Sequence, residues 1–158
     1  MNENDKKVMF SSASDEYATP QSFYDKLNME FNFQLDPASS PDNHKCWSFY
    51  TMEEDGLSKS WKLLHGSVFC NPPYSKVAKW IEKGYTESVE HSTTVVMLVP
   101  ARTDTKWFHQ YCMKASEVRF VKGRLKFGNE KNSAPFPSMV VVFRGDNTAG
   151  PKMVAMER

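Results

Sequence analysis

Hydrophobic and polar positions along this chain switch repeatedly between helical and strand spacing. After Thr19-Pro20, apolar residues recur every three to four positions, which predicts a helix over residues 20–30 with Thr19 as N-cap and Pro20 in its first position. A similar stripe predicts a helix over about 75–91, and Asp104 is expected to N-cap another. Alternating or β-branched runs predict strands over residues 31–36, 47–50, 93–99, 117–127 and 139–143.

One further apolar run ends in an unusual motif. Residues 67–70 read Ser-Val-Phe-Cys, which suits a buried parallel strand, and Asn71-Pro72-Pro73-Tyr74 follows directly. Because the two prolines cannot donate to a β-ladder, the chain must leave the sheet there. Asn71 is therefore expected at the carboxyl edge of the sheet, where α/β proteins bind their ligands.

The order of these elements predicts an α/β fold, a three-layer α/β/α sandwich with a mostly parallel sheet and an antiparallel last strand at 139–143. Right-handed crossovers would place Asp36, the acidic turn 53–56, Asn71 and Pro100 along one edge. Residues 1–14 are expected to form a flexible arm, 15–145 the domain, and 146–158 a frayed tail. A chain of 158 residues leaves no room for a separate target-recognition domain.

Composition and charge narrow the class of protein. Twenty Lys and Arg against 19 Asp and Glu give no global signal for nucleic acid, so any basic surface must be local. The three cysteines contain no C-x-x-C pair, which argues against a disulfide scaffold or a zinc site, and no metal is expected. The longest apolar run, 95–99, is too short to cross a bilayer, so a cytoplasmic protein without a membrane partner is expected.

The motif at residues 71–74 has a chemical interpretation. The side-chain oxygen of Asn71 and the carbonyl of Pro72 are two acceptors on a stiff backbone, and Tyr74 adds a ring for stacking. Two acceptors that hold the hydrogens of a planar amine, such as the 6-amino group of adenine, would point its lone pair at an electrophile. The alternative is a Pro-Pro turn in which Asn71 caps the helix beginning near Ser75.

Several blocks in this order resemble the phage-type DNA N-6-adenine methyltransferases, the Dam family. The similarity covers most of residues 15–143 and includes the motif at 71–74. The other blocks are Asp15-Glu16-Tyr17-x-Thr19-Pro20, Phe33-Gln34-Leu35-Asp36, Asp55-Gly56-Leu57 with Trp61, residues 100–109, residues 123–128 and residues 134–138. The resemblance implies the Rossmann-like fold of S-adenosylmethionine-dependent methyltransferases.

The resemblance also implies roles for individual residues. Asn71, Pro72, Pro73 and Tyr74 would hold a flipped adenine, and S-adenosylmethionine would give up its methyl group directly, in line, without a covalent enzyme intermediate. Cofactor contacts are expected from the strand ends and from the segment before the first helix, namely Tyr17, Thr19, Pro20, Asp36, Glu53 and Asp55. The alternative for each acid is a turn or cap residue. Residues 37–41 lack the glycine-rich loop of larger methyltransferases, which leaves the detailed cofactor contacts open.

DNA contacts are expected from residues beyond the fourth strand and near the end of the domain: Arg102, Lys122, Arg124, Lys126, Phe136 and Ser138. The alternative for Arg102 is a salt bridge to Asp104. The alternative for Lys122, Arg124 and Lys126, the basic row, is a strand face that is merely exposed to solvent. The loop 129–138 is expected to close over DNA.

Three functions remain open from the sequence. The first is methylation of adenine in DNA, with a role implied by resemblance in protecting phage or prophage DNA from restriction. The second is methylation of RNA or of a protein glutamine amide. The third is DNA binding by a catalytically inactive relative. The recognised DNA sequence and the choice between monomer and homodimer are undetermined.

Overall fold

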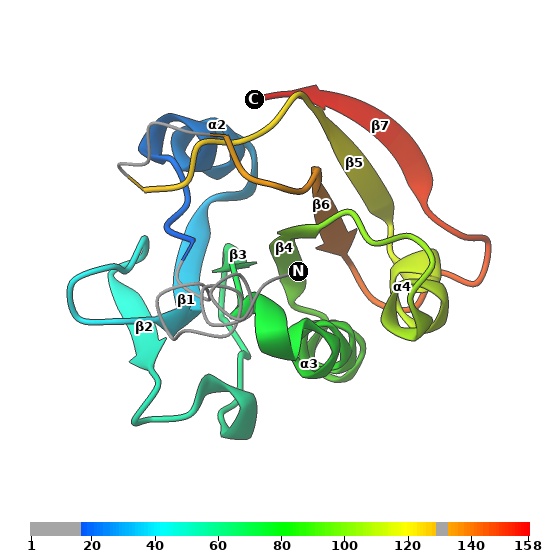
Figure 1. Cartoon of the computed structure of the whole chain (residues 1–158). Coiled ribbons are helices and arrows are strands. Elements are labelled where there is room, and N and C mark those ends of the chain that lie inside the picture. Colours follow the sequence, from blue (N-terminus) through cyan, green and yellow to red (C-terminus); the bar gives the residue numbers. More distant parts are fainter. Residues whose placement is uncertain (1–16, 129–132) are drawn as a thin grey trace.

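The computed structural model describes residues 17–128 and 133–158. The expected arm over residues 1–14 and residues 129–132 of the predicted loop therefore lie outside the described residues. The described chain forms a seven-stranded sheet in the order β2-β1-β3-β4-β6-β5-β7, with helices on both faces (Figure 1). This is the three-layer α/β/α arrangement that the sequence predicted.

Neighbouring strands of the sheet are parallel except where β6 lies between β4 and β5. The antiparallel strand expected at 139–143 is thus confirmed, but it is not the last strand of the chain. The strands are β1 (Phe33–Ser39), β2 (Ser48–Thr51), β3 (Ser67–Cys70), β4 (Thr94–Pro100), β5 (Glu117–Lys122), β6 (Ser138–Phe143) and β7 (Lys152–Glu157).

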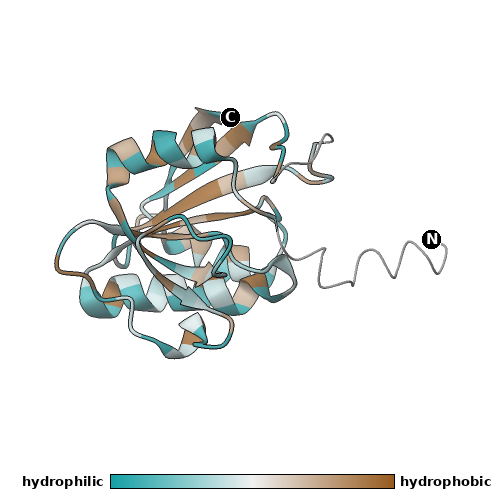
Figure 2. Ribbon diagram, turned by 90° about the vertical axis from the view of Figure 1, so that its left-hand side faces the viewer, coloured by the Kyte–Doolittle hydropathy of each residue, from teal (hydrophilic) through white to brown (hydrophobic). Residues whose placement is uncertain are grey.

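The helices divide the core into two clusters. Helix α2 (Gln21–Phe31) covers one face, and α3 (Val77–His91) with α4 (Lys106–Gln110) covers the other (Figure 1). Successive residues of β4 serve opposite faces: Val95 packs beneath α3 and α4, whereas Val96 packs beneath α2. The central strands β3, β4 and β6 are accordingly buried and largely hydrophobic along almost their whole length, whereas the helices carry many polar residues, as the colours of Figure 2 show.

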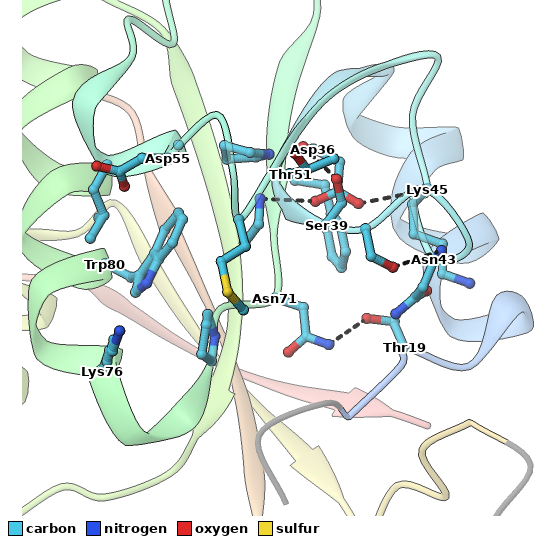
Figure 3. Close-up of a pocket in the computed structure, with 18 of the residues that line it drawn as sticks. Thr19, Asp36, Ser39, Asn43, Lys45, Thr51, Asp55, Asn71, Lys76 and Trp80 are labelled. Carbon is cyan, nitrogen blue, oxygen red and sulfur yellow. Dashed lines mark hydrogen bonds between the residues drawn. The ribbon is translucent and has the colours of Figure 1, made fainter. Parts of the chain in front are cut away.

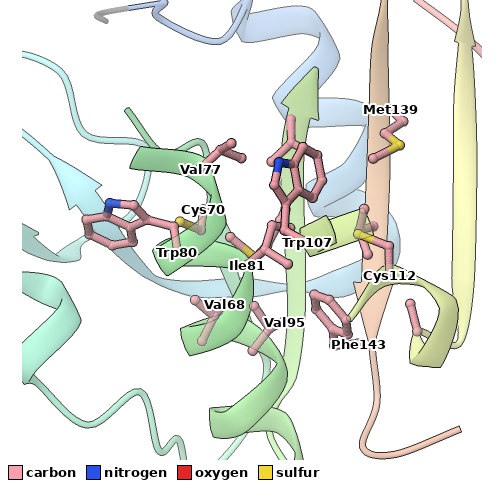
Figure 4. Close-up of a cluster of buried hydrophobic side chains, with 14 of the residues drawn as sticks. Val68, Cys70, Val77, Trp80, Ile81, Val95, Trp107, Cys112, Met139 and Phe143 are labelled. Carbon is pink, nitrogen blue, oxygen red and sulfur yellow. The ribbon is translucent and has the colours of Figure 1, made fainter. Parts of the chain in front are cut away.

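The larger aromatic side chains fill the layer beneath α3 and α4. Trp80 and Ile81 from α3 and Trp107 from α4 meet Val95 and Phe143 of the sheet (Figure 4). These residues come from segments distant in sequence, so this core fixes α3 and the start of that helix relative to the sheet. Among the described residues, no helix is both long and apolar enough to span a membrane.

Two helix starts differ from the sequence prediction. Pro20, not Thr19, occupies the N-cap position of α2, and no side chain caps that helix. The N-cap of α4 is Thr105, whose side chain accepts a hydrogen bond from the backbone N–H of Phe108, so the prediction of Asp104 was wrong by one residue. Thr19 does not cap because its hydroxyl is used elsewhere, as described below.

Two strands end elsewhere than expected. β1 continues through Pro37 to Ser39, and its register with β2 shifts between Asp36 and Ser39, an irregularity that accommodates a residue without an N–H. β5 stops at Lys122 because Gly123 turns the chain with a φ of 78°. Leu125 and Phe127, which lie beyond the turn but within the predicted strand 117–127, are nevertheless buried.

A seventh strand replaces the frayed tail predicted for residues 146–158. β7 pairs in parallel with β5 from Lys152 opposite Glu117 to Glu157 opposite Lys122. Most of its side chains are exposed, so the strand is held mainly by its backbone ladder. Residues 153–156 are all apolar and do not alternate with polar residues, and the less exposed members, Val154 and Met156, are only half-buried, so the alternation that marks a half-buried strand is missing from the sequence.

The topology creates one position suited to a ligand. From β1 the chain passes to β2 on one side, and from β3 it passes to β4 on the other. The carboxyl ends of β1 and β3 therefore border the point where the strand order reverses, which is where open α/β sheets bind ligands. Asp36 lies in β1, and Asn71 follows β3.

Candidate active site

A pocket of about 650 Å³ opens at this edge of the sheet (Figure 3). Its walls come from the segment before α2, the ends of β1 and β2, the acidic turn, the residues after β3 and the first part of α3. The lining residues that matter below are Tyr17, Thr19, Asp36, Ser39, Thr51, Asp55, Gly56, Asn71, Pro73, Lys76, Lys79 and Trp80. The structure thus brings Asp36, Asp55 and Asn71 together, as the sequence predicted.

The carboxamide of Asn71 is held in one orientation. Its Nδ2 donates hydrogen bonds to the backbone carbonyl of Tyr17 and, at 3.0 Å, to the hydroxyl of Thr19 (Figure 3). Its Oδ1 is buried and has no hydrogen-bond partner among the described residues. Asn71 therefore does not cap the following helix, and its unpaired acceptor suits a donor from a ligand.

Asp36 is a buried carboxylate whose hydrogen-bond donors among the described residues are backbone N–H groups. Its Oδ2 accepts from Lys45 at 3.0 Å and its Oδ1 from Ala38 at 3.4 Å, and it forms no ion pair within the described part of the chain. Burial raises the pKa of Asp36 to about 6, although the two backbone bonds and the charges of His44 and Lys45 act in the opposite direction. A cationic ligand group would relieve this cost.

The acidic turn contributes Asp55 and a close backbone contact. Asp55 lines the pocket with a left-handed backbone, and a Cβ on Gly56 would lie 2.0 Å from the carbonyl oxygen of Pro37. Glycine at position 56 thus lets the turn approach β1. Glu53 is exposed and does not line the pocket, so the structure does not bring it to the place that the resemblance implied.

Tyr74 is buried behind the pocket rather than exposed within it. The ring of Tyr17 stacks on it with centroids 5.3 Å apart and planes at 16°, and Phe127 and Phe136 meet it edge-on. Burial raises the pKa of Tyr74. The expectation of a free stacking face at Tyr74 is therefore wrong for this structure, because Tyr17 covers it.

Only some of the other residues of the 71–74 motif and of the segment before α2 line the pocket. Tyr17, Thr19 and Pro73 line the pocket, whereas Pro20 and Pro72 do not. Pro72 is buried, and it fixes the backbone between Asn71 and the turn of 3-10 helix at Tyr74–Lys76.

The predicted DNA contacts are scattered over the surface and interior. Arg102 is exposed beyond β4, and its charge lowers the pKa of Tyr74, against the larger effect of burial. The alternative of an ion pair from Arg102 to Asp104 is not found among the described residues. Within residues 17–128 and 133–158, Arg102 therefore has no ion-pair partner, and its charge lies close enough to Tyr74 to act on it.

The basic row at the end of the domain is exposed, but two of its three side chains contact other parts of the protein. Lys122 lies 3.9 Å from Glu157, and Arg124 donates to the carbonyl of Ala134. Lys126 is exposed. Ser138 is fully buried at the start of β6, so the structure does not place it where DNA would reach it, while Phe136 packs against Tyr17.

Sequence reasoning missed Lys76, Lys79 and Trp80 as pocket residues. The helical spacing in this part of the chain is typical of a core residue at Trp80 and of outward-facing residues at the two lysines, and Trp80 is part of the core. In the structure all three line the pocket, and the indole Nε1 of Trp80 is buried with no partner among the described residues. Their position directly after the 71–74 motif was the available signal, because the first turns of a helix after a strand face the same edge.

Other chemistries find little support at this site. The described residues contain no group of three or more His, Cys, Asp or Glu side chains arranged to hold a metal. The thiols of Cys46, Cys70 and Cys112 are buried, and burial raises the pKa of each. None of them is poised as a thiolate nucleophile.

Comparison with known proteins identifies the family. The model of the family described as DNA N-6-adenine-methyltransferase (Dam) matches residues 6–154. The chain is 31% identical over 140 residues to a DNA N-6-adenine-methyltransferase of Haemophilus phage HP1, covering 84% of this chain and 80% of that protein. It is 33% identical over 113 residues to a DNA N-6-adenine-methyltransferase of Escherichia phage T1, covering 70% of this chain and 46% of that protein.

Proposed function

This chain belongs to the DNA N-6-adenine-methyltransferase (Dam) family, and from that premise we propose that it methylates adenine in DNA within the pocket beside Asn71. One observation carries the proposal. The buried side-chain oxygen of Asn71, which has no partner in the described chain, shares a pocket with the buried carboxylate of Asp36, which has no ion pair there. An acceptor for an amine and a carboxylate for a cation are the two groups that this reaction needs.

Asn71 acts on the amino group of the target base. Its Oδ1 and the carbonyl of Pro72 accept the two hydrogens of the adenine amino group, which favours a pyramidal nitrogen with an available lone pair. With the cofactor bound, the lone pair would form the bond to the methyl carbon while the bond from that carbon to the sulfonium sulfur breaks, which leaves a neutral thioether, and the nitrogen would then release a proton to water. The chain needs no nucleophile of its own, in agreement with the buried, protonated state of its cysteines.

The residues of the pocket fit S-adenosylmethionine. When bound, this cofactor supplies an electrophilic methyl group on a sulfonium. Asp36 offers a carboxylate to the ammonium group of the cofactor. On the opposite side of the pocket, Asp55 offers an acceptor to the amino group of the cofactor's own adenine ring (Figure 3). The volume of about 650 Å³ lies within the range of small-molecule sites. Glu53 has no part in this proposal because its side chain lies outside the pocket lining.

Stacking of the target base on Tyr74 requires the ring of Tyr17 to move. The Tyr17–Tyr74 stack is worth about 0.5–1.5 kcal/mol, and base–aromatic stacking about 1–3 kcal/mol. Replacing the ring of Tyr17 by the target base therefore yields only a small net gain in stacking free energy. Flipping costs a few kcal/mol. Contacts to the DNA backbone must therefore supply the rest of the free energy of flipping. Arg102 beyond β4, which forms no ion pair with the described residues, is suited to a phosphate.

The relatives support a proposal for the biological setting. Both are phage proteins, which supports a role in which methylation protects phage or prophage DNA from restriction endonucleases in the bacterial cytoplasm. Plasmid from cells that express the chain should then resist endonucleases that adenine methylation blocks. Sequencing of the modified adenines on that plasmid would also identify the recognised sequence.

The decisive experiment follows the methyl group. Purified protein is incubated with labelled S-adenosylmethionine and plasmid from a host without adenine methylation, and the DNA is digested to nucleosides. We expect labelled N-6-methyladenine, and we expect Asn71→Ala to lower turnover at least about a hundredfold with little change in cofactor affinity. Label in RNA or in protein glutamine would support the second function above. DNA binding without any cofactor affinity would support an inactive relative.

A further inference from the structure

The contacts of Asn71 assign a role to Thr19 that differs from cofactor binding. We propose that Thr19, together with the backbone carbonyl of Tyr17, is a positioning residue that fixes the carboxamide of Asn71 so that its Oδ1 faces the amino group of the target base. This inference rests on the proposed function of the pocket. The two contacts span more than fifty positions in sequence, with separations of 54 and 52 residues.

The carbonyl of Tyr17 selects the orientation of the carboxamide. A carbonyl oxygen can only accept, so it pairs with the Nδ2 of Asn71 and would repel Oδ1 if the carboxamide rotated by half a turn. A hydroxyl can accept or donate, so Thr19 alone would tolerate both orientations. The orientation with Oδ1 free is therefore specified by the backbone of the segment before α2.

Thr19 accepts the second hydrogen bond that fixes the carboxamide of Asn71. A carboxamide nitrogen carries two hydrogens, and the hydroxyl of Thr19 at 3.0 Å accepts the one that the carbonyl of Tyr17 leaves. Thr19 is 4% exposed, so solvent cannot easily replace this acceptor. Without it, one hydrogen of Nδ2 would be buried and unpaired, and the carboxamide would gain by swinging toward another acceptor.

The same contacts explain why Thr19 does not cap α2. An N-cap threonine directs its oxygen to the N–H groups of its own helix, but here that oxygen faces the end of β3, and α2 has no side-chain cap. The hydroxyl of Thr19 therefore bonds Asn71 and leaves α2 without a side-chain cap. That choice is expected for a residue that serves the site rather than the helix.

The test separates positioning from cofactor binding and from folding. Thr19→Val removes the acceptor at nearly constant shape, and Thr19→Ser keeps it. The matched control is Thr93→Val, because Thr93 is a buried threonine at the amino end of β4, away from the pocket, and its hydroxyl has no partner among the described residues. Each variant is measured for turnover at saturating DNA and cofactor, for cofactor Kd by calorimetry and for thermal midpoint.

We expect Thr19→Val to lower kcat about tenfold or more while the cofactor Kd changes by less than about threefold. Thr19→Ser and Thr93→Val should keep turnover near that of the wild type. An unchanged kcat in Thr19→Val, or a large loss of cofactor affinity with normal turnover at saturation, would overturn the proposal. If Thr19→Val does not fold, Thr19→Ala replaces it under the same criteria.

The outcome remains separate from that of the proposed function. If the wild type transfers no methyl group to DNA, the proposed function fails whatever Thr19 does. If the wild type methylates DNA and Thr19→Val is equally active, only the positioning role fails.

Discussion

Asp36 provides the sharpest test of the cofactor site, because its environment makes binding depend on pH. The carboxylate is 4% exposed, and its pKa is raised from 3.8 to about 6 by burial. One pKa unit corresponds to about 1.4 kcal/mol, so ionisation of Asp36 costs roughly 3 kcal/mol in the ligand-free protein. A cofactor ammonium beside Asp36 would remove most of that cost.

The sign of the effect follows from proton linkage. Between about pH 4 and about pH 6 the folded protein binds more protons at Asp36 than the unfolded chain, so Asp36 lowers the stability of the ligand-free protein as pH rises through this window. Binding of a cation requires the ionised form. Cofactor affinity should therefore be greatest near about pH 7, where Asp36 is ionised and the cofactor ammonium is still protonated, and should weaken toward about tenfold per pH unit below about pH 6.

The assay is calorimetry of S-adenosylmethionine binding from about pH 5 to about pH 8. Asp36→Asn should bind weakly at every pH and should lose the slope. Its stability at neutral pH should change little, because the removed charge offsets the loss of one acceptor for the backbone N–H groups of Ala38 and Lys45.

His44 needs its own control, since its charge also acts on Asp36. His44→Gln should retain a pH-dependent affinity centred near the pKa of Asp36. A wild-type Kd that does not change across the acidic range, or a slope that survives in Asp36→Asn, would refute the reasoning.

Three further predictions concern the base site and the framework. Tyr17→Ala should uncover Tyr74 and lower the KM for DNA a few-fold, whereas Tyr17→Phe should behave as the wild type; an increase in KM for Tyr17→Ala would show that the ring helps to bind DNA. Gly56→Ala would place a Cβ 2.0 Å from a backbone oxygen of β1, so calorimetry should show lost cofactor affinity and thermal melting a lower midpoint, and an unchanged midpoint would contradict the close approach. Glu87→Ala removes the buried carboxylate that accepts a hydrogen bond from the backbone N–H of Trp61 and pairs with Lys83. Urea unfolding should show that the free energy of unfolding falls by about 3 kcal/mol. A change within experimental error would mean that this contact does not hold the loop before β3.

The sequence anticipated those parts of the site that depend on local pattern. An apolar run stopped by Pro72 and Pro73 has to leave the sheet, and so Asn71 stands at a strand end whatever the rest of the fold does. Asp36 near the end of an alternating strand follows the same logic. Parallel strands share their carboxyl edge, and the two residues were therefore predicted to meet.

Other features had no local signature. β7 has only half-buried side chains on its inner side and no alternation of apolar and polar residues, so its sequence did not mark it as a strand. Trp80 has the spacing of a core residue, and only the position of α3 against the turn at Gly56–Ser58 makes it part of the pocket wall. Glu53 and Asp55 were indistinguishable as acids of one turn, and the backbone conformation decided which of them faces the pocket.

The amino-acid sequence by itself determined the alternation of strands and helices, the strand edge at Asn71 and the chemical groups available there, because these depend on neighbours a few positions apart. The tertiary structure alone decided which way the carboxamide of Asn71 points and that Tyr17 covers Tyr74. Both depend on contacts between segments more than fifty residues apart, whose relative placement is fixed by packing of the whole sheet and not by any local preference.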